Sequence, residues 1–314
     1  MNVLNQEVND NYSLYHGDSV EIIKGIPDNS IHYSIFSPPF ASLYTYSNSE
    51  RDMGNSKTRD EFYEHFNFLI SELFRVTMSG RLLSFHCMNL PTFITHDGYI
   101  GIKDFRGDLI RLFQASGWSY HSEVVIWKDP LLAATRTKAI GLMHKQLCKD
   151  SAISRNGIPD YLVTMRKIGE NPEPINHGRG FERYVGEGEI NELKHDDPQK
   201  NKYSHHVWRK YASPIWMDIR ATRTLQASVA RDGNDERHIC PLQLDVIERC
   251  IELWSNPGDV ILSPFAGIGS EGAVSIETGR KFIGIELKES YYNQAVKNLN
   301  AAVQKKDNQF VMEF

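Results

Sequence analysis

The sequence predicts a doubly wound α/β fold on a mostly parallel sheet, with helices on both faces. Three observations support this fold class. Short apolar runs typical of strands alternate with amphipathic runs typical of helices, a glycine turn joins one such pair, and 40% of the residues are hydrophobic. A length of 314 residues fits one large domain, or one domain carrying a sizeable insertion.

The expected elements follow one another along the chain. Before residue 170 we expect strands at Ile31 to Phe36, Arg81 to Phe85, Glu123 to Trp127 and Tyr161 to Met165, and helices at Asp60 to Thr77 and Asp104 to Gln114. After residue 240 we expect a helix (Leu242 to Trp254), a strand (Val260 to Leu262), a short helix from Ser270, a strand (Phe282 to Ile285) and a helix (Glu289 to Val303).

The stretch from Gly169 to about Asn234 differs, because it is rich in Gly, Pro, Asn, His and charge and shows little periodicity. A loop of this length inside a compact domain is usually functional or disordered. Residues 131–235 hold 17 Lys and Arg against 13 Asp and Glu, whereas the whole chain has a net charge of −5. A basic segment in an acidic frame suits phosphate contacts, although an ordinary solvated surface explains the charge equally well.

Several classes of protein and site are disfavoured. The apolar runs are shorter than a membrane span and the polar start lacks a signal peptide, so we expect a cytoplasmic protein without membrane contact. The four cysteines (Cys87, Cys148, Cys240 and Cys250) form no CxxC pair, so we expect structural thiols and no metal. The pair His205-His206 is expected to lie in a polar loop.

A glycine turn follows the strand at Val260. The run SPFAGIGSEG places Gly267 and Gly269 where the backbone can pass close to a ligand at the start of a helix. Glu286 ends the next strand, where an acidic residue can accept hydrogen bonds from both ribose hydroxyls of a nucleoside. Gly-x-Gly alone would indicate only a tight turn, but together with Glu286 it favours a nucleoside site.

A second corner follows the strand at Ile31, in the run Ser37-Pro38-Pro39-Phe40. Prolines have a fixed φ and hold their neighbours' carbonyls in place. An exocyclic amino group is a poor nucleophile, and acceptors on its two hydrogens, such as the Ser37 hydroxyl and the Pro38 carbonyl, would aim its lone pair. Phe40 could stack on an extruded base. An ordinary Pro-Pro loop remains the alternative for this run alone.

With these motifs in hand, the chain resembles the amino-methylating DNA methyltransferases of the β order, and phage-type orphan methylases among them. The matching runs are GDSVEIIKGIPDNSIHYSIFSPPF, NDERHICPLQLDVIERCIELWSNPGD, SPFAGIGSEG and FIGIELKESYY, in the family's order and over nearly the whole chain. The resemblance implies a Rossmann-like methyltransferase fold with circularly permuted motifs. It also implies a catalytic half (12–168), an inserted target-recognition region (169–234, with DNA contacts perhaps from 131) and a cofactor-binding half (235–305).

The resemblance implies S-adenosyl-L-methionine as cofactor, S-adenosyl-L-homocysteine as product, and no metal. Asp18 would contact the cofactor's adenine and Glu286 its ribose, while Ser37, Pro38, Pro39 and Phe40 would hold the target base. The remaining cofactor-binding candidates are Ser37, His238, Pro241, Leu242, Ser263, Pro264, Phe265, Ala266, Gly267, Gly269, Ser270 and Leu287.

Two residues depart from the family's pattern. Ser263 stands where many members have Asp, which weakens one polar contact near the methionine amine. Ser37 also replaces Asp, a choice associated mostly with cytosine-N4 enzymes but also found in adenine-N6 members. The chain as a whole leans to N6 of adenine, and N4 of cytosine stays open. Amino methylation of RNA and a non-catalytic DNA-binding protein are further alternatives. No cysteine follows a proline, which disfavours cytosine-C5 chemistry.

The expected partner is double-stranded DNA, with a possible homodimer. No nuclease motif is visible, so a restriction partner is unknown and a stand-alone role is plausible. Arginine can read guanine edges or only hold phosphate, so the segment is a firmer prediction than its members. The candidate DNA contacts are Arg136, Lys138, Lys145, Arg155, Arg179, Arg183, Lys202, Arg209, Arg220 and Arg223.

Overall fold

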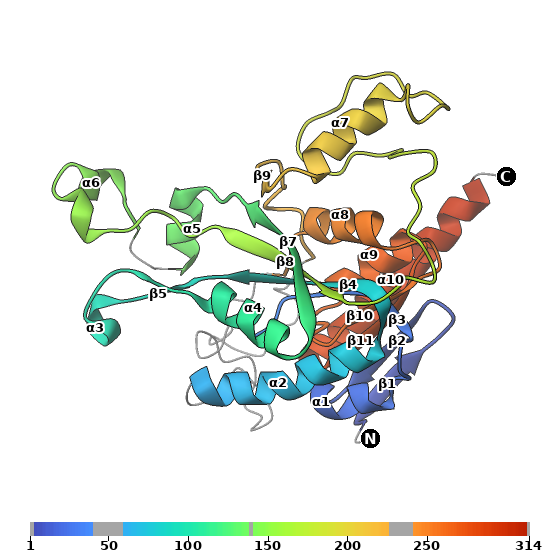
Figure 1. Cartoon of the computed structure of the whole chain (residues 1–314), viewed down its shortest axis with the longest axis horizontal. Helices are drawn as coiled ribbons and strands as arrows, with labels where there is room; N and C mark the ends of the chain where they lie inside the picture. Colours follow the sequence, from blue (N-terminus) through green and yellow to red (C-terminus); the bar gives the residue numbers. More distant parts are fainter. Residues whose placement is uncertain (1–2, 40–58, 138–140, 226–240, 313–314) are drawn as a thin grey trace.

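A nine-stranded sheet forms the centre of the computed structural model, which describes residues 3–39, 59–137, 141–225 and 241–312 (Figure 1). The strand order is β1-β2-β11-β10-β3-β4-β8-β7-β9. These strands are β1 (Asn5–Val8), β2 (Tyr12–His16), β3 (Ile31–Phe36), β4 (Thr77–Met88), β7 (Trp118–Ile126), β8 (Asp160–Lys167), β9 (Ile215–Trp216), β10 (Val260–Ser263) and β11 (Lys281–Glu286). A separate two-stranded sheet pairs β5 (Leu90–Pro91) with β6 (Ile102–Lys103).

The middle of the large sheet is parallel. Strands β2, β11, β10, β3 and β4 pair side by side in parallel, and β8 then runs antiparallel between β4 and β7. The expected mostly parallel sheet is therefore confirmed. Strand β3 pairs with β10 although more than 220 residues separate them in the chain, as a permuted motif order requires.

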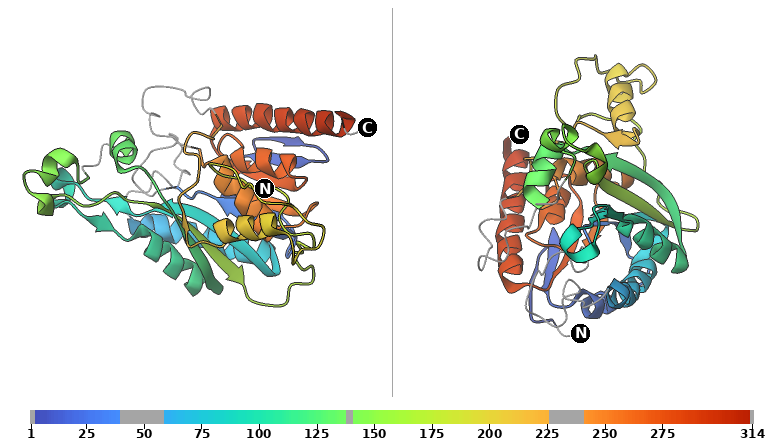
Figure 2. Two further views of the ribbon diagram at one scale, coloured as in Figure 1. Left: turned by 90° about the horizontal axis from the view of Figure 1, so that it is seen from above. Right: turned by 90° about the vertical axis from the view of Figure 1, so that its left-hand side faces the viewer.

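Helices cover both faces of the sheet, and Figure 2 shows α2 and α10 on opposite sides of it. One buried cluster joins α1 (Ser19–Ile22), α2 (Arg59–Val76) and α4 (Phe105–Ala115) to one face. A second cluster joins α8 (Leu244–Trp254), α9 (Ser270–Glu277) and α10 (Glu289–Met312) to the other face. The shorter helices are η1 (Ile23–Gly25), α3 (Ile94–Asp97), α5 (Pro130–Thr137), α6 (His144–Leu147) and η4 (Ser151–Ile153). Within the described ranges, no helix combines the length and the apolar character that crossing a bilayer would require.

The prediction of an aperiodic stretch after Gly169 is wrong in part, because α7 (Lys202–Tyr211) lies within it and includes His205 and His206. Its buried side is short and partly polar, made of Ser204, Val207 and Tyr211, so the helical period is hard to see in the sequence. The side chain of Asn201 accepts a hydrogen bond from the Ser204 N–H, an N-cap that marks the start of the helix.

A buried arginine of α8 contacts the segment that contains α7 and β9. Arg249 is fully buried, and its Nε donates to the carbonyl of Val185 at 2.7 Å. Its Nη1 lies 3.0 Å from Asp218 Oδ1, and its guanidinium group stacks over the rings of Tyr211 and Trp216. Burial alone would raise the pKa of Asp218, but the hydrogen bonds from Arg249 and Tyr184 hold it below its usual value. Arg249 thus ties residues 185–218 to α8.

The Arg249→Met variant tests this attachment. Methionine fills much of the same volume but leaves the half-buried Asp218 carboxylate with only the more distant Lys210 as a cation, at 3.7 Å, and breaking a buried pair costs about 3 kcal/mol. We expect a clear fall in the urea midpoint followed by circular dichroism. Arg209→Met, at an exposed position of α7, should leave the midpoint unchanged. Equal midpoints for the two variants would contradict this role for Arg249.

Candidate functional site

The two predicted corners meet at one edge of the sheet. Because β3 and β10 are parallel neighbours, with Leu262 opposite Ser34, the residues that follow both strands emerge at the same edge. Ser37 and Pro38 follow β3, and the glycine loop follows β10. The rings of Phe36 and Phe265 are in contact, with centroids 5.8 Å apart. The structure thus brings the proline corner and the glycine turn together.

Glu286 ends β11, the next strand of the same edge, and holds the glycine turn. Its Oε2 accepts the backbone N–H of Gly267 at 2.8 Å, and its Oε1 accepts that of Lys288, also at 2.8 Å. A carboxylate offers about four lone-pair positions, so ribose hydroxyls can bind the group that also orders the loop. Glu286, the acidic residue that was predicted to accept the ribose hydroxyls, therefore contacts the glycine turn.

The two glycines of the turn differ in their surroundings. Both have positive φ, 53° at Gly267 and 87° at Gly269. A Cβ on Gly269 would press against Ala295 of α10, whereas a Cβ on Gly267 would meet nothing within 4 Å. The open side of Gly267 leaves room for a ligand against the backbone. Ser263 Oγ, at the start of this loop, is buried without a hydrogen-bond partner among the described residues and can accept one from an ammonium group.

Asp18 follows β2 and lies at the same edge of the sheet as Glu286. The N–H of Gly17 donates to the Glu286 carbonyl at 2.9 Å, which places the end of β2 beside the end of β11. Asp18 caps α1, since its Oδ1 accepts the Val20 N–H at 2.9 Å. The Leu287 carbonyl lies 3.0 Å from His16 Nε2 and so belongs to the same junction. These residues fit a nucleoside moiety spread across β2, β11 and β10.

For the other predicted cofactor-binding residues, the structure shows burial but no contact that points to a cofactor. Leu242 is buried in the core beneath α8, which gives it a packing role, and Pro241 is half-buried before it. Pro264, Ala266 and Ser270 are buried around the turn. Phe40 and His238 lie outside the described residues, as do Cys240 and Lys138.

Three further residues form a series of contacts that begins at Ser37, and no sequence motif predicted them. Ser37 Oγ lies 3.0 Å from Nδ1 of His86, near the end of β4. His86 Nε2 lies 3.1 Å from Oδ2 of Asp160, at the start of β8, and Asp160 Oδ1 lies 2.5 Å from Lys128 Nζ, just after β7. These four residues are distributed over four separate segments, so only the sheet topology brings them together.

Three of the candidate DNA contacts have another role in the structure. Arg220 binds both carboxylate oxygens of Asp245, at 2.9 and 2.7 Å. Arg223 pairs with Asp245 and with Glu248, both at 2.7 Å, and Arg183 also pairs with Glu248. Asp245 and Glu248 are buried residues of α8, so these arginines neutralise the frame beneath the insertion. In the structure, Arg220, Arg223 and Arg183 are therefore ion-pair partners of the α8 carboxylates, and a phosphate contact through any of them stays a prediction.

The remaining basic candidates differ in exposure. Lys202 and Arg209 are exposed on α7, and together with His205, His206 and Trp208 they line a shallow hollow. Arg179 and Lys145 are exposed as well, while Arg155 is half-buried, which lowers the pKa of its guanidinium group. Arg136 lies on α5, but its side chain is outside the described part of the structure. The exposed face of α7 is thus the clearest basic surface of the insertion.

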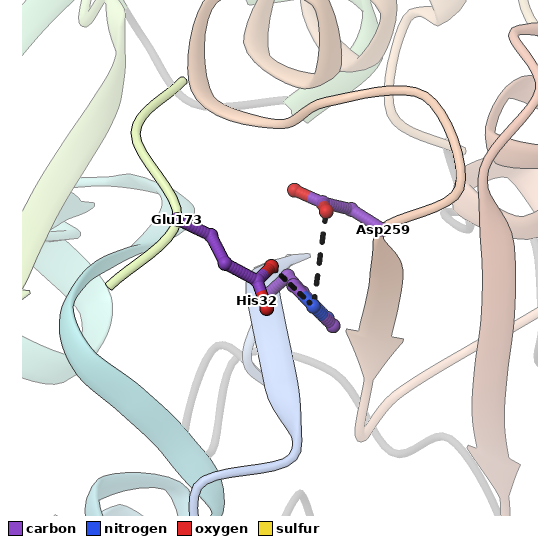
Figure 3. A group of neighbouring side chains, drawn as sticks. All are labelled: His32, Glu173 and Asp259. Carbon is purple, nitrogen blue, oxygen red and sulfur yellow. Dashed lines mark ion pairs between the residues drawn. The ribbon is translucent and has the colours of Figure 1, made fainter. Parts of the chain in front are cut away.

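A cluster of possible metal ligands lies at the opposite edge of the sheet (Figure 3). His32 Nε2 is 3.4 Å from Glu173 and 3.7 Å from Asp259, and the buried Arg81 lies 3.1 Å from Asp259. The Val260 N–H donates to His32 Nδ1, so the ring proton is on Nε2, which faces the two carboxylates as a donor. This histidine nitrogen has no lone pair to offer, and Arg81 already supplies the positive charge. The cluster is a structural ion pair.

Two of the three described cysteines fit the expected structural thiols, whereas Cys148 is exposed. Cys87 and Cys250 are buried, and burial raises the pKa of both thiols. Neither is therefore a nucleophile near neutral pH.

Comparison with known proteins agrees with this geometry. A family model described as DNA methylase, of the N6/N4 type, matches residues 31–297. The DNA adenine methyltransferase YhdJ of Escherichia coli K12 is 35% identical over 106 residues, and this match spans only 34% of either chain. The type II methyltransferase M.ScaI of Streptomyces caespitosus is 25% identical over 93% of this chain and 82% of its own length.

Among solved structures, a DNA modification methylase of Thermus thermophilus in complex with S-adenosyl-L-methionine has a TM-score of 0.62 and 19% identity. The match covers 93% of this chain and 96% of that one. The two proteins therefore share their fold.

A buried acid lies beside the cofactor candidates. Glu271, in the first turn of α9, is buried, and this burial, with a smaller contribution from Glu286, raises its pKa to about 8. The unfolded chain releases this proton near pH 4.5. Between these two pH values only the unfolded chain releases the proton, so the contribution of Glu271 to the free energy of unfolding is fully present below about pH 4.5. It falls by about 1.4 kcal/mol per pH unit as the pH rises to 8.

The Glu271→Gln variant should remove this loss. We expect the wild-type protein to lose stability relative to Glu271→Gln between pH 5 and pH 8, because glutamine does not ionise in the folded or the unfolded protein. Urea midpoints of both proteins at the two pH values measure the effect. Glu189→Gln, at an exposed position, serves as control and should follow the wild type. A gap between wild type and Glu271→Gln that does not widen with pH would contradict the expectation.

Proposed function

Because the chain belongs to the N6/N4 family of DNA methylases, we propose that it transfers a methyl group from S-adenosylmethionine to the exocyclic amino nitrogen of a base in duplex DNA. The observation that carries this proposal is the parallel pairing of β3 with β10, which places Ser37 and Pro38 beside the glycine turn. A base extruded from the duplex can enter at this corner.

The chain's own residues bind and orient the reactants. Glu286 accepts hydrogen bonds from the ribose hydroxyls, and Asp18 contacts the adenine of the cofactor. Ser263 Oγ accepts a hydrogen bond from the methionine ammonium group. S-adenosylmethionine, when bound, supplies an electrophilic methyl group on a sulfonium. The open backbone at Gly267 lets the cofactor approach the loop closely.

At the base corner, two acceptors aim the amino nitrogen. The Ser37 hydroxyl oxygen and the Pro38 carbonyl accept one amino hydrogen each, which draws the lone pair out of conjugation and toward the methyl group. Pro38 is buried and Ser37 half-buried, so both acceptors are fixed and partly shielded from water. Orientation and desolvation of the reacting pair then supply most of the rate.

Two bases are candidates for the target. N6 of adenine is supported by the likeness to the adenine methyltransferase YhdJ, which extends over one third of the chain. N4 of cytosine is supported by Ser37, since serine in this motif is associated mostly with cytosine-N4 enzymes. Both bases offer an amino group conjugated with the ring, so the corner suits either chemically.

Transfer of labelled methyl groups to duplex DNA, followed by nucleoside analysis, tests the function and identifies the base. We expect label in N6-methyladenine or N4-methylcytosine, and none in 5-methylcytosine. Label in RNA but not in duplex DNA would refute the DNA substrate, and no label in either nucleic acid would refute the transfer itself.

Two single variants should separate binding from chemistry. Ser37→Ala removes an acceptor at the base, so we expect kcat to fall by about 10²-fold or more while cofactor affinity, measured by calorimetry, stays within a few-fold. Glu286→Ala should instead weaken cofactor binding, because it removes the ribose acceptor and releases the turn. Loss of cofactor binding in Ser37→Ala would count against the roles assigned here.

The exposed face of α7 is the proposed phosphate contact. Replacing Lys202 and Arg209 with Gln should weaken duplex binding for all sequences and reduce the slope of log affinity against log salt by about two. Arg111→Gln, at an exposed position on α4, should leave DNA binding unchanged. An unaltered salt slope in the double variant would exclude α7 as a phosphate contact.

A further inference from the structure

A chain of polar side chains leads away from the proposed base corner. It joins Ser37, His86, Asp160 and Lys128 through contacts of 3.0, 3.1 and 2.5 Å. Asp160 is only 2% exposed, and a buried carboxylate is tolerated when cations or donors neutralise it. None of the other three residues of this chain has been assigned a role in binding the cofactor or the base.

The ionisation of Asp160 determines how the protons of this chain are arranged. Burial would raise the pKa of Asp160, but His86 and Lys128 beside it hold the pKa below its ordinary value. An ionised carboxylate only accepts hydrogen bonds, so the 3.1 Å approach of Asp160 Oδ2 favours a proton on His86 Nε2. Nδ1 then carries a lone pair and accepts the Ser37 hydroxyl proton.

This arrangement fixes the direction of the Ser37 hydroxyl. Its hydrogen points to His86, so its oxygen lone pairs are available to accept an amino hydrogen of the base. Without the histidine, the hydroxyl could rotate and present its hydrogen to the amino group instead. The arrangement corresponds to the serine, histidine and carboxylate order of hydrolases, where the carboxylate fixes the histidine tautomer.

Resting on the function proposed above, we propose that His86, held by Asp160, is a positioning residue that orients Ser37 and takes up the proton released by methyl transfer. The amino nitrogen's lone pair forms the new bond to the methyl carbon as the carbon–sulfur bond breaks, and the electron pair of that bond stays on sulfur. The amino proton passes to Ser37 Oγ while the Ser37 hydroxyl proton passes to His86 Nδ1. The resulting imidazolium is stabilised by the Asp160 carboxylate.

The outer end of the chain reaches the solvent. Lys128 is 31% exposed at its side chain and lines a cavity of about 220 Å³ beyond the ends of β4 and β7. Once the methylated base has left, the imidazolium returns its Nδ1 proton through the Ser37 hydroxyl to water at the base corner, and the proton that remains on the ring is the one on Nε2.

The charged surroundings of His86 make the activity dependent on its protonation. Ser37 faces it from the end of β3, and Asp160 and Lys128 face it from β8 and from the end of β7. Around the neighbouring Cys87, the charges besides Asp160 are the paired Arg106 and Glu123, and Asp104. If His86 gains a proton before the reaction, Nδ1 becomes a donor and Ser37 loses its acceptor, so activity falls at acid pH.

His86→Gln is the decisive variant. The glutamine side chain can accept from Ser37 and donate to Asp160, but it cannot take up a proton. We expect kcat to fall by about 10²-fold or more, with KM for DNA and cofactor affinity within about twofold of wild type, and the acid limb of the pH profile to disappear. His121→Gln on β7 is the matched control and should match the wild type. A wild-type kcat with an unchanged pH profile in His86→Gln would overturn the proposal.

A spectroscopic measurement tests the proposal without catalysis. In protein labelled with ¹⁵N-histidine, with the His86 signals assigned by their loss in His86→Gln, we expect the Nε2–H tautomer. In Asp160→Asn, the amide can donate to Nε2 and should shift the proton to Nδ1. A wild-type Nδ1–H tautomer would overturn the proposal even if methylation is observed. Absence of methylation by the wild type would instead refute the proposed function, whatever the tautomer.

Discussion

The parallel hydrogen bonding between β3 and β10 is the constraint on which the site depends. Each strand is short, and neither carries a complete site. Their pairing in one register places a serine and proline corner next to a glycine turn, and β11 and β2 then add Glu286 and Asp18 to the same edge. A shift of one residue would turn the side chains of a strand to the opposite face of the sheet. Leu262 and Ile261 pack in two different buried clusters, so such a shift would place each side chain in packing that does not fit it.

The parts of the molecule that could be predicted from sequence are those with local signals. The helix beginning near Asp60 has a regular apolar stripe, and Phe62, Phe66, Leu69 and Leu73 are all buried. The glycine turn and the acidic end of the next strand form a pattern because their spacing along the chain is fixed. Their meeting with Ser37 was predicted only through the family resemblance, since hydrophobic periodicity does not specify strand order.

The unpredicted parts depend on contacts between distant segments. His86 was an ordinary residue of a strand until the sheet placed it between Ser37 and Asp160. The arginines at 220 and 223 were read as DNA contacts because charge is visible in the sequence and its partner is not. Buried Asp245 and Glu248 supply that partner, so a net positive segment can owe part of its charge to internal pairing.

The bonds that Glu286 already makes bear on the selection of ligands. Because two backbone N–H groups fix its carboxylate, a nucleoside would meet an acceptor whose rotamer is already set, and little side-chain entropy remains to be lost on binding. The same fixed negative charge would repel a phosphate on either ribose hydroxyl. With Glu286 in its proposed role at the ribose, the end of β11 would admit unphosphorylated sugars and reject nucleotides phosphorylated at the 2′ or 3′ position.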